Sequence, residues 1–208
     1  MRNIAGKTLR ALRANLDRLP PSIRPVAAAL ARSSDQALRA LEPLLTQRFT
    51  GLRIRIHGDY HLDQVLSTGK DFVIIDFDGQ AGDTLAERRR KHSCLRDVAG
   101  MIRSFHFAAG AALLDTTILR EEDRSAATPW IEAWHRWLSA TFLGAYVPAV
   151  ASARILPDED ELSLMLNTHL LAGALHELND ELVACGETVA IPVLAVAALL
   201  ERPLGGAA

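Results

Sequence analysis

The segment His57-Gly58-Asp59-Tyr60-His61-Leu62-Asp63-Gln64 carries most of the information about the fold and the chemistry of this chain, together with Asp76 a short distance downstream. Phosphoryl transfer needs a carboxylate that orients the attacking hydroxyl, and oxygen ligands that hold Mg²⁺ against the nucleotide phosphates. Asp59, Gln64 and Asp76 are side chains of the right types at a workable spacing. The segment therefore predicts a phosphotransferase site.

A β-hairpin is predicted between Gln64 and Asp76. Val65-Leu66 precedes turn residues at 67–70, and the run 72–75 is apolar and β-branched, as strands are. Pairing these two runs brings Gln64, just before one strand, close to Asp76, just after the other. A single divalent cation could then contact both side chains.

The motifs H-x-D-x-x-x-x-N/Q and D-F-x, in this order, resemble those of the aminoglycoside-phosphotransferase and protein-kinase-like superfamily. The chain is more specifically similar to bacterial maltokinases, and several successive motifs are more specific than one short signature. The matching stretches are 53–66, 71–79, 85–93, 95–107 and, more loosely, 174–192.

The resemblance to maltokinases implies a role for each polar residue of the segment. Asp59 matches the catalytic carboxylate, and Gln64 and Asp76 match the residues that bind Mg²⁺ and, through it, ATP. The implied reaction phosphorylates the anomeric hydroxyl of maltose and gives maltose 1-phosphate for α-glucan synthesis. The alternative for each Asp is a structural role, because Asp often caps backbone amides in turns.

Four further residues are candidates for sugar binding by the same resemblance. Glu177 and Glu181 lie one turn apart on a predicted helix, where the family carries a Tyr-Glu pair and a second Glu, and carboxylates accept hydrogen bonds from sugar hydroxyls. Lys91 and Arg96 lie in matching stretches around the basic run 88–92. The alternative for all four is an exposed, solvated side chain.

This chain departs from the family pattern at several positions. Asp63 stands where the family usually has Gly, and Asp78-Gly79-Gln80-Ala81 replaces a Glu-Gly-Glu-Pro-like run. His176 and Asp180 replace expected tyrosines. A carboxylate at position 63 either helps to attract Mg²⁺ or raises neighbouring pKa values by repulsion. These departures leave room for an acceptor other than maltose.

The expected architecture is one mainly α-helical lobe with a small β-hairpin (α+β), similar to the C-terminal lobe of a protein-kinase-like fold. It divides into leading helices at 1–49, a catalytic hairpin at 50–80 and a helical subdomain at 81–208. No phosphate-covering glycine loop precedes residue 50, and Gly69-Lys70 lacks the P-loop spacing. We therefore expect the nucleotide-covering N-terminal lobe to be absent from this chain, and an apolar surface to be exposed where that lobe would sit.

Hydrophobic periodicity predicts the individual helices. Two are expected within 1–47 and others at 96–114, 121–147, 158–184 and 191–201, packed around the apolar face of the hairpin; a strand is expected at 53–56. Pro129 is expected to start the long helix within 121–147, with Thr128 as its N-cap. Trp130, Trp134 and Trp137 form a helical stripe that we assign to the core, and Asp97 is expected to brace the lobe.

Composition excludes several other classes of protein. The net charge of −2 favours neither nucleic acid nor an anionic membrane as a partner, and the longest apolar stretch is too short to span a bilayer. Cys94 and Cys185 show no C-x-x-C pattern, and the first residues given lack the apolar run of a signal peptide, so a cytoplasmic location is expected. The histidines show no zinc-site spacing.

Three functions are consistent with the sequence. The first is the catalytic lobe of a maltokinase, which uses ATP and Mg²⁺ and works with a separate or missing N-terminal lobe. The second is a kinase of the same superfamily that acts on another sugar or a small alcohol. The third is a noncatalytic module that docks on a partner such as a trehalose-to-maltose isomerase.

Overall fold

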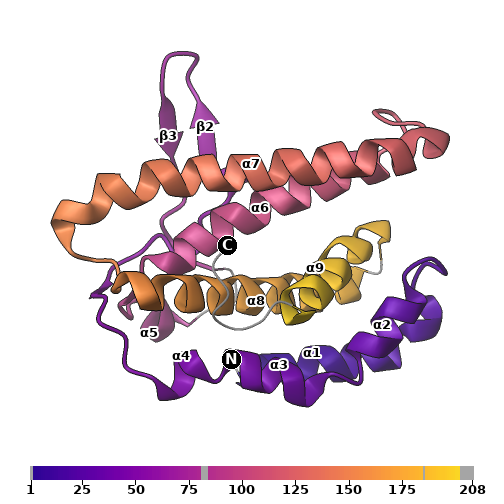
Figure 1. The fold of residues 1–208 in the computed structure, drawn as a ribbon, viewed down its shortest axis with the longest axis horizontal. Helices are drawn as coiled ribbons and strands as arrows, with labels where there is room; N and C mark the ends of the chain where they lie inside the picture. Colours follow the sequence, from indigo (N-terminus) through magenta and orange to yellow (C-terminus); the bar gives the residue numbers. More distant parts are fainter. Residues whose placement is uncertain (1, 81–83, 185, 202–208) are drawn as a thin grey trace.

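Three long helices form the body of the molecule, in a computed structural model that describes residues 2–80, 84–184 and 186–201. They are α6 (Leu95–Leu114), α7 (Arg124–Val150) and α8 (Glu159–Ala184), and they lie side by side in Figure 1. The helix predicted at 96–114 and the helix predicted at 158–184 are confirmed almost to the residue. The helix predicted at 191–201 is confirmed as α9 (Ala190–Glu201), which packs against α8.

The leading region holds more helices than the two that the sequence predicted. It contains α1 (Arg2–Ala14), α2 (Arg24–Leu30), α3 (Ser34–Leu41) and α4 (Pro43–Thr46), with a 3₁₀ turn at Leu16–Arg18. Proline lacks an N–H group and is tolerated mainly in the first turn of a helix. Pro25 and Pro43 therefore each lie at the start of a new helix instead of inside a longer one.

Helix α8 is shared by two hydrophobic clusters. One side of it packs against α1, α3 and α9 through residues such as Leu175 and Leu178, which are fully buried, in a cluster that also includes residues of α2. The other side packs Leu166 and Leu170 against Leu95 and neighbouring residues of α6. Each fully buried leucine contributes about 1.5–3 kcal/mol of hydrophobic free energy, so α8 ties the leading helices to the helix that supports the site.

The predicted hairpin is present. Strand β2 (Val65–Ser67) pairs antiparallel with β3 (Phe72–Ile74), with Leu66 opposite Val73. Gly69 in the connecting turn has φ +83°, a conformation that glycine adopts without steric cost. The strand expected at 53–56 is reduced to β1 (Arg53–Ile54), and it pairs with β4 (His92–Ser93), a partner that the sequence pattern did not indicate.

The hairpin projects from the helical body, as Figure 1 shows, so the prediction that helices pack around its apolar face is wrong. Phe72 is 70% exposed, and Val73, Ile74 and Phe77 are also exposed. A two-stranded ribbon buries little on its own. The hairpin therefore leaves apolar side chains uncovered within the described chain, and that a nucleotide-covering lobe would sit on them stays a prediction.

Helix α7 corrects two sequence-based assignments. Its helical turns begin at Arg124, so Pro129 lies inside the helix, and the Thr128 hydroxyl donates a hydrogen bond to the Arg124 carbonyl instead of capping the helix. Trp130, Trp134 and Trp137 are exposed, not in the core. The inward side of α7 is formed by other residues, Phe142, Leu143 and Tyr146, which pack against the α6–α8 cluster.

Shorter elements complete the described chain. Helix α5 (Leu85–Arg88) begins with a capping box, in which the Thr84 hydroxyl accepts the Glu87 N–H and the Glu87 carboxylate accepts the Thr84 N–H. Further 3₁₀ turns lie at Leu62–Gln64, Glu121–Asp123, Ala151–Ala153 and Glu187–Val189. Within the described ranges, no helix combines the length and the apolar character that a membrane span requires.

Candidate active site

The loop that carries Asp59 is held by the first turn of α6. Asp97 accepts two backbone hydrogen bonds, from the N–H of His57 at 2.7 Å and from the N–H of Gly58 at 2.9 Å. Burial raises the pKa of Asp97, and these two N–H groups act in the opposite direction by stabilising its charge. Asp97 therefore holds this loop through two specific contacts, whereas the sequence indicated only that it braces the lobe from the start of a helix.

His57 connects this loop to the end of the hairpin. Its buried ring places Nε2 2.7 Å from the Ile75 carbonyl, which can only accept, so Nε2 carries the proton. Nδ1 is then free to accept the N–H of Asp59 at 3.3 Å. One imidazole thus fixes the backbone of Asp59 relative to the residue that precedes Asp76.

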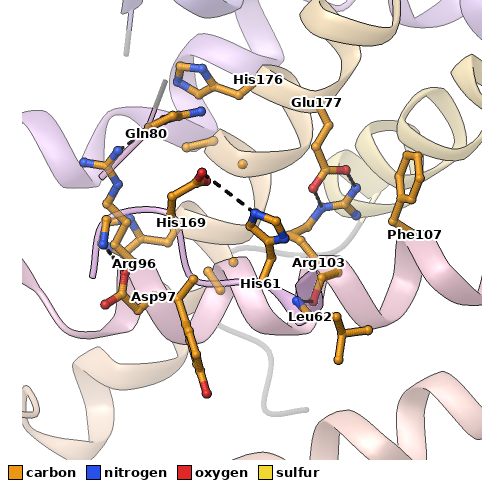
Figure 2. A pocket seen from close by; sticks show the side chains of 18 of the residues that line it. His61, Leu62, Gln80, Arg96, Asp97, Arg103, Phe107, His169, His176 and Glu177 are labelled. Carbon is orange, nitrogen blue, oxygen red and sulfur yellow. Dashed lines mark hydrogen bonds and ion pairs between the residues drawn. The ribbon is translucent and has the colours of Figure 1, made fainter. Parts of the chain in front are cut away.

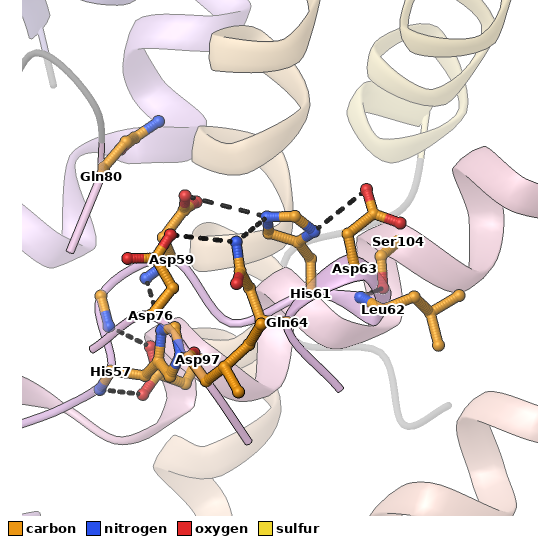
Figure 3. A network of polar contacts seen from close by, with 12 residues as sticks. His57, Asp59, His61, Leu62, Asp63, Gln64, Asp76, Gln80, Asp97 and Ser104 are labelled. Carbon is orange, nitrogen blue, oxygen red and sulfur yellow. Dashed lines mark hydrogen bonds and ion pairs between the residues drawn. The ribbon is translucent and has the colours of Figure 1, made fainter. Parts of the chain in front are cut away.

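Asp59, Gln64 and Asp76 come together at the base of the hairpin, where Figure 3 shows their side chains pointing toward one another. Gln64 Nε2 lies 3.5 Å from Asp76 Oδ2, and the Gln64 carbonyl accepts the Ile75 N–H at 3.0 Å. Asp76 has φ +60°, which is uncommon for a residue other than glycine. Strained backbone of this kind often occurs at functional positions.

His61 is the central residue of this group, a position that was not predicted from the sequence. Its Nε2 lies 3.8 Å from Asp59 Oδ2 and 3.4 Å from Gln64 Nε2, and its Nδ1 lies 3.7 Å from Asp63 Oδ2. Asp63 is thereby on the far side of the ring from Asp59, with its side chain 92% exposed (Figure 3). The H-x-D-x-H spacing was the signal that could have indicated this arrangement.

The donor set fits Mg²⁺ bound together with phosphate. In the described parts of the chain, no cluster of three or more His, Cys, Asp or Glu has metal-binding geometry. Mg²⁺ in phosphoryl-transfer sites usually takes one or two protein oxygens, with waters and substrate phosphates completing its shell. Asp76 offers a carboxylate. A flip of the Gln64 side-chain amide by about 180° would present its oxygen in place of its nitrogen.

A cavity of about 830 Å³ lies beside the loop and is lined by Asp59, His61 and Asp63. Helices α6 and α8 supply the opposite wall. In Figure 2, Gln80 and Arg96 lie on one side of the cavity, and Arg103 and Glu177 lie on the other. This volume lies within the range of small-molecule sites, so the cavity has room for a sugar.

Glu177 is paired with Arg103, a residue of α6 that the sequence analysis missed. The Arg103 Nε atom donates to Glu177 Oε1 at 3.1 Å, and its Nη2 atom donates to Oε2. Burial raises the pKa of Glu177, while Arg103 acts to lower it. Burial also lowers the pKa of the neighbouring His106 to about 3, with Arg103 and His135 adding to the effect, so His106 is neutral at pH 7.

The other predicted sugar-binding residues are not all at the cavity. Arg96 lines it and donates to the Gln80 side chain at 3.3 Å. Lys91 is exposed and does not line it, whereas its neighbours Arg90 and His92 do. Glu181 also lies outside the lining and accepts a hydrogen bond from the Thr188 hydroxyl. The position of Ala81, part of the altered 78–81 run, is outside the described residues.

Gly100 allows α6 to approach the loop that carries Asp59. A Cβ atom at this position would lie 2.6 Å from the Tyr60 carbonyl oxygen, a backbone atom that cannot rotate away. A Gly→Ala change inside a helix normally stabilises it by about 0.5–1 kcal/mol. For Gly100→Ala we expect the opposite, a loss of about 1–3 kcal/mol, because the loop must move.

The measurement for Gly100→Ala is urea unfolding, compared with Gly6→Ala on α1, where the nearest atom is a flexible arginine side chain at 3.4 Å. Gly6→Ala should be neutral or stabilising. Equal effects of the two changes would show that the contact between α6 and Tyr60 is not tight.

Comparisons with known proteins find similarity to glucosamine kinases, in sequence over part of the chain and in fold over most of it. No protein-family model matches the chain. Two curated relatives are glucosamine kinases: one from Streptacidiphilus jiangxiensis, 29% identical over 98 residues, and one from Mycolicibacterium smegmatis, 35% identical over 82 residues. These alignments cover 47% and 38% of this chain, and 21% of each relative.

Solved structures cover far more of the chain. A glucosamine kinase in complex with glucosamine, ADP and inorganic phosphate superposes with a TM-score of 0.69 at 23% identity, over 94% of this chain and 46% of that one. Another crystal form of glucosamine kinase gives a TM-score of 0.70 at 22% identity, over 95% and 43%. The chain therefore has the fold of a part of glucosamine kinase and spans less than half the length of those structures.

Proposed function

We propose that this chain is the catalytic and acceptor-binding part of an ATP-dependent sugar kinase. The observation that carries the proposal is the convergence of Asp59, Gln64 and Asp76 at the base of the hairpin, beside a cavity that Asp59 also lines. The fold shared with glucosamine kinase supports it. A cytoplasmic location, where ATP is available, belongs to the same proposal.

The roles of the residues follow from what phosphoryl transfer requires. Asp59 accepts the proton of the attacking sugar hydroxyl and orients its oxygen, with its backbone positioned by His57 and the loop braced by Asp97. Asp76 and Gln64 would hold Mg²⁺, which neutralises the phosphate charge when it is bound. The protein thus acts by positioning and electrostatics more than by covalent chemistry.

We propose glucosamine as the acceptor. The curated relatives and solved neighbours are glucosamine kinases, and one of them holds glucosamine and ADP. The cavity presents Asp59, Glu177 and Asp180, whose carboxylates suit an ammonium group and sugar hydroxyls. Maltose, the acceptor that the maltokinase resemblance implies, is the second candidate, because a cavity of about 830 Å³ also has room for a disaccharide.

A nucleotide-covering part is proposed to act together with this chain. The exposed apolar side chains Phe72, Val73 and Ile74 belong to β3, the strand that ends two residues before Asp76. The chain also covers less than half of the solved glucosamine kinases. No observation on the described part of the structure favours a trehalose-to-maltose isomerase as a partner, and that interaction stays a prediction.

The test is sugar-dependent ADP release. The chain is assayed with MgATP and glucosamine, maltose or no sugar, both alone and after fusion to the part of a glucosamine kinase that it does not cover. We expect glucosamine-dependent ADP release from the fused protein, and at least about tenfold lower kcat/KM with maltose, which corresponds to roughly 1.4 kcal/mol. ADP release that no sugar increases would overturn the proposal.

Binding of the acceptor can be measured apart from catalysis. Calorimetric titration of the chain with glucosamine, without nucleotide, compares Glu177→Gln with Glu181→Gln, which remove carboxylates one turn apart. Glu177 lines the cavity and Glu181 does not. We expect Glu177→Gln to weaken binding by about tenfold, the value of one hydrogen bond to a charged group, and Glu181→Gln to have no effect. The reverse order would show that the cavity does not hold the sugar.

A further inference from the structure

Helix α7 has a continuous side that nothing in the described structure covers. It has no buried residue along its 27 residues, and Trp130, Trp134 and Trp137 are 78%, 48% and 76% exposed. The spacing of four and three places these rings on one stripe. Thr141, Gly144 and Pro148 continue the same stripe toward the C-terminal end of the helix and are also exposed.

The stripe is apolar along its whole length. From Trp137 to Val150 the helix has no charged residue. The Thr141 hydroxyl donates to the Trp137 carbonyl at 2.9 Å, so it is satisfied within the helix. Glu132 and Arg136 at the margin are 3.6 Å apart and face each other. An exposed apolar patch of this extent usually marks an interaction surface.

The positions of the stripe residues are symmetric about Ser139, with the three tryptophans before it and the three smaller residues after it. Trp130 and Pro148 are equally far from it in sequence, as are Trp134 and Gly144, and Trp137 and Thr141. A second α7 helix that runs antiparallel across a two-fold axis would therefore place each tryptophan opposite a smaller residue. Self-complementarity of this kind is what an isologous interface requires.

There is room for a tryptophan of a second copy at Gly144, which lies between Thr141 and Pro148 on the stripe. A Cβ atom added at Gly144 would meet nothing within 4 Å. The three exposed rings supply roughly 300–500 Å² of contact area per copy, about half of the roughly 800 Å² that one partner contributes to a standard interface. The small residues along a helix about 40 Å long supply further area.

We propose that α7 is a homodimer interface, in which the tryptophans of one copy pack on Thr141, Gly144 and Pro148 of a second, antiparallel copy. The partner is a second copy of this chain, because the spacing matches each tryptophan to a smaller residue of an identical, antiparallel helix. This interface is independent of the proposed kinase activity, since α7 supplies none of the residues that line the cavity.

The first test is the solution mass of the chain by light scattering and sedimentation at micromolar concentrations. We expect twice the mass of one chain, and the single-chain mass for Trp134→Lys and for Gly144→Leu. Gly144→Leu is the sharper variant, because leucine raises helix propensity and its Cβ meets no atom within the monomer, yet it fills the site of the partner's tryptophan. Its helical circular dichroism should be unchanged or stronger.

The control is Phe72→Lys, which removes an equally exposed aromatic residue from the hairpin. This variant should remain dimeric. A single-chain mass for the unmodified protein, a dimer that survives both α7 substitutions, or a dimer that Phe72→Lys abolishes would each overturn the proposal.

Cross-linking tests the antiparallel geometry. In a Cys185→Ser background, with Cys94 buried, a cysteine at position 141 or 125 is treated with a short bismaleimide. Two copies of position 141 would be offset by about 6 Å along the helix axes, and two copies of position 125 by about 42 Å. We expect a cross-linked dimer from Thr141→Cys and none from Ser125→Cys. The opposite pattern would exclude this antiparallel pairing.

Discussion

Asp59→Asn should lower the rate of phosphoryl transfer to the sugar by about 10²–10⁴-fold, the range for loss of a positioned general base. Asparagine has nearly the same shape, but it cannot accept the proton of the attacking hydroxyl. The side chain of Asp59 is 35% exposed, and its Oδ2 lies 3.8 Å from the His61 ring. We therefore expect the unfolding free energy and the KM for sugar to change little, so that the loss lies in kcat.

Asp63→Asn is the matched control, because Asp63 also faces His61 but from the other side of the ring. Its side chain is 92% exposed, and exposed charge pairs contribute about 0–1 kcal/mol. The rate should stay within about threefold of the original, since threefold corresponds to less than about 1 kcal/mol. Rates for the two variants are compared in the fused protein by ADP release. If the two variants lost equal amounts of the rate, Asp59 would not be the general base.

The parts of the site that sequence predicted correctly are those set by local pattern. Gln64 and Asp76 flank two strands joined by a short turn, so pairing the strands brings them together whatever surrounds the hairpin. Asp97 lies in the first turn of a helix with clear apolar periodicity, where an acidic residue suits the helix dipole. Neither inference needed the position of a distant element, but the contacts of Asp97 with the N–H groups of His57 and Gly58 do, and they were not predicted.

The parts that sequence could not predict depend on how separate elements pack. The tryptophan spacing shows that three rings share one side of α7, but periodicity alone does not say which side meets the core. Likewise, Glu177 and Glu181 are equivalent by spacing. What distinguishes them is Arg103, which lies 74 residues before Glu177 in the sequence and reaches it only in the folded chain.

Asp97→Ala should destabilise the protein by about 2–4 kcal/mol, because it leaves the N–H groups of His57 and Gly58 without their acceptor. Asp97→Asn keeps one acceptor oxygen and should cost less, about 1–2 kcal/mol. Asp115→Ala, at the exposed end of α6, is the control. It removes a local bond to the Thr117 N–H that water can replace, so it should cost under about 1 kcal/mol.

Urea unfolding measures these three variants, and we expect the cost to be largest for Asp97→Ala, intermediate for Asp97→Asn and smallest for Asp115→Ala. The same bonds position the loop that carries Asp59, so the kcat of Asp97→Asn should fall more than its stability alone explains at a temperature where it is fully folded. If Asp97→Ala were as stable as Asp115→Ala, the link from α6 to the catalytic loop would be dispensable. The loop would then have to be held by the contact between His57 and Ile75 instead.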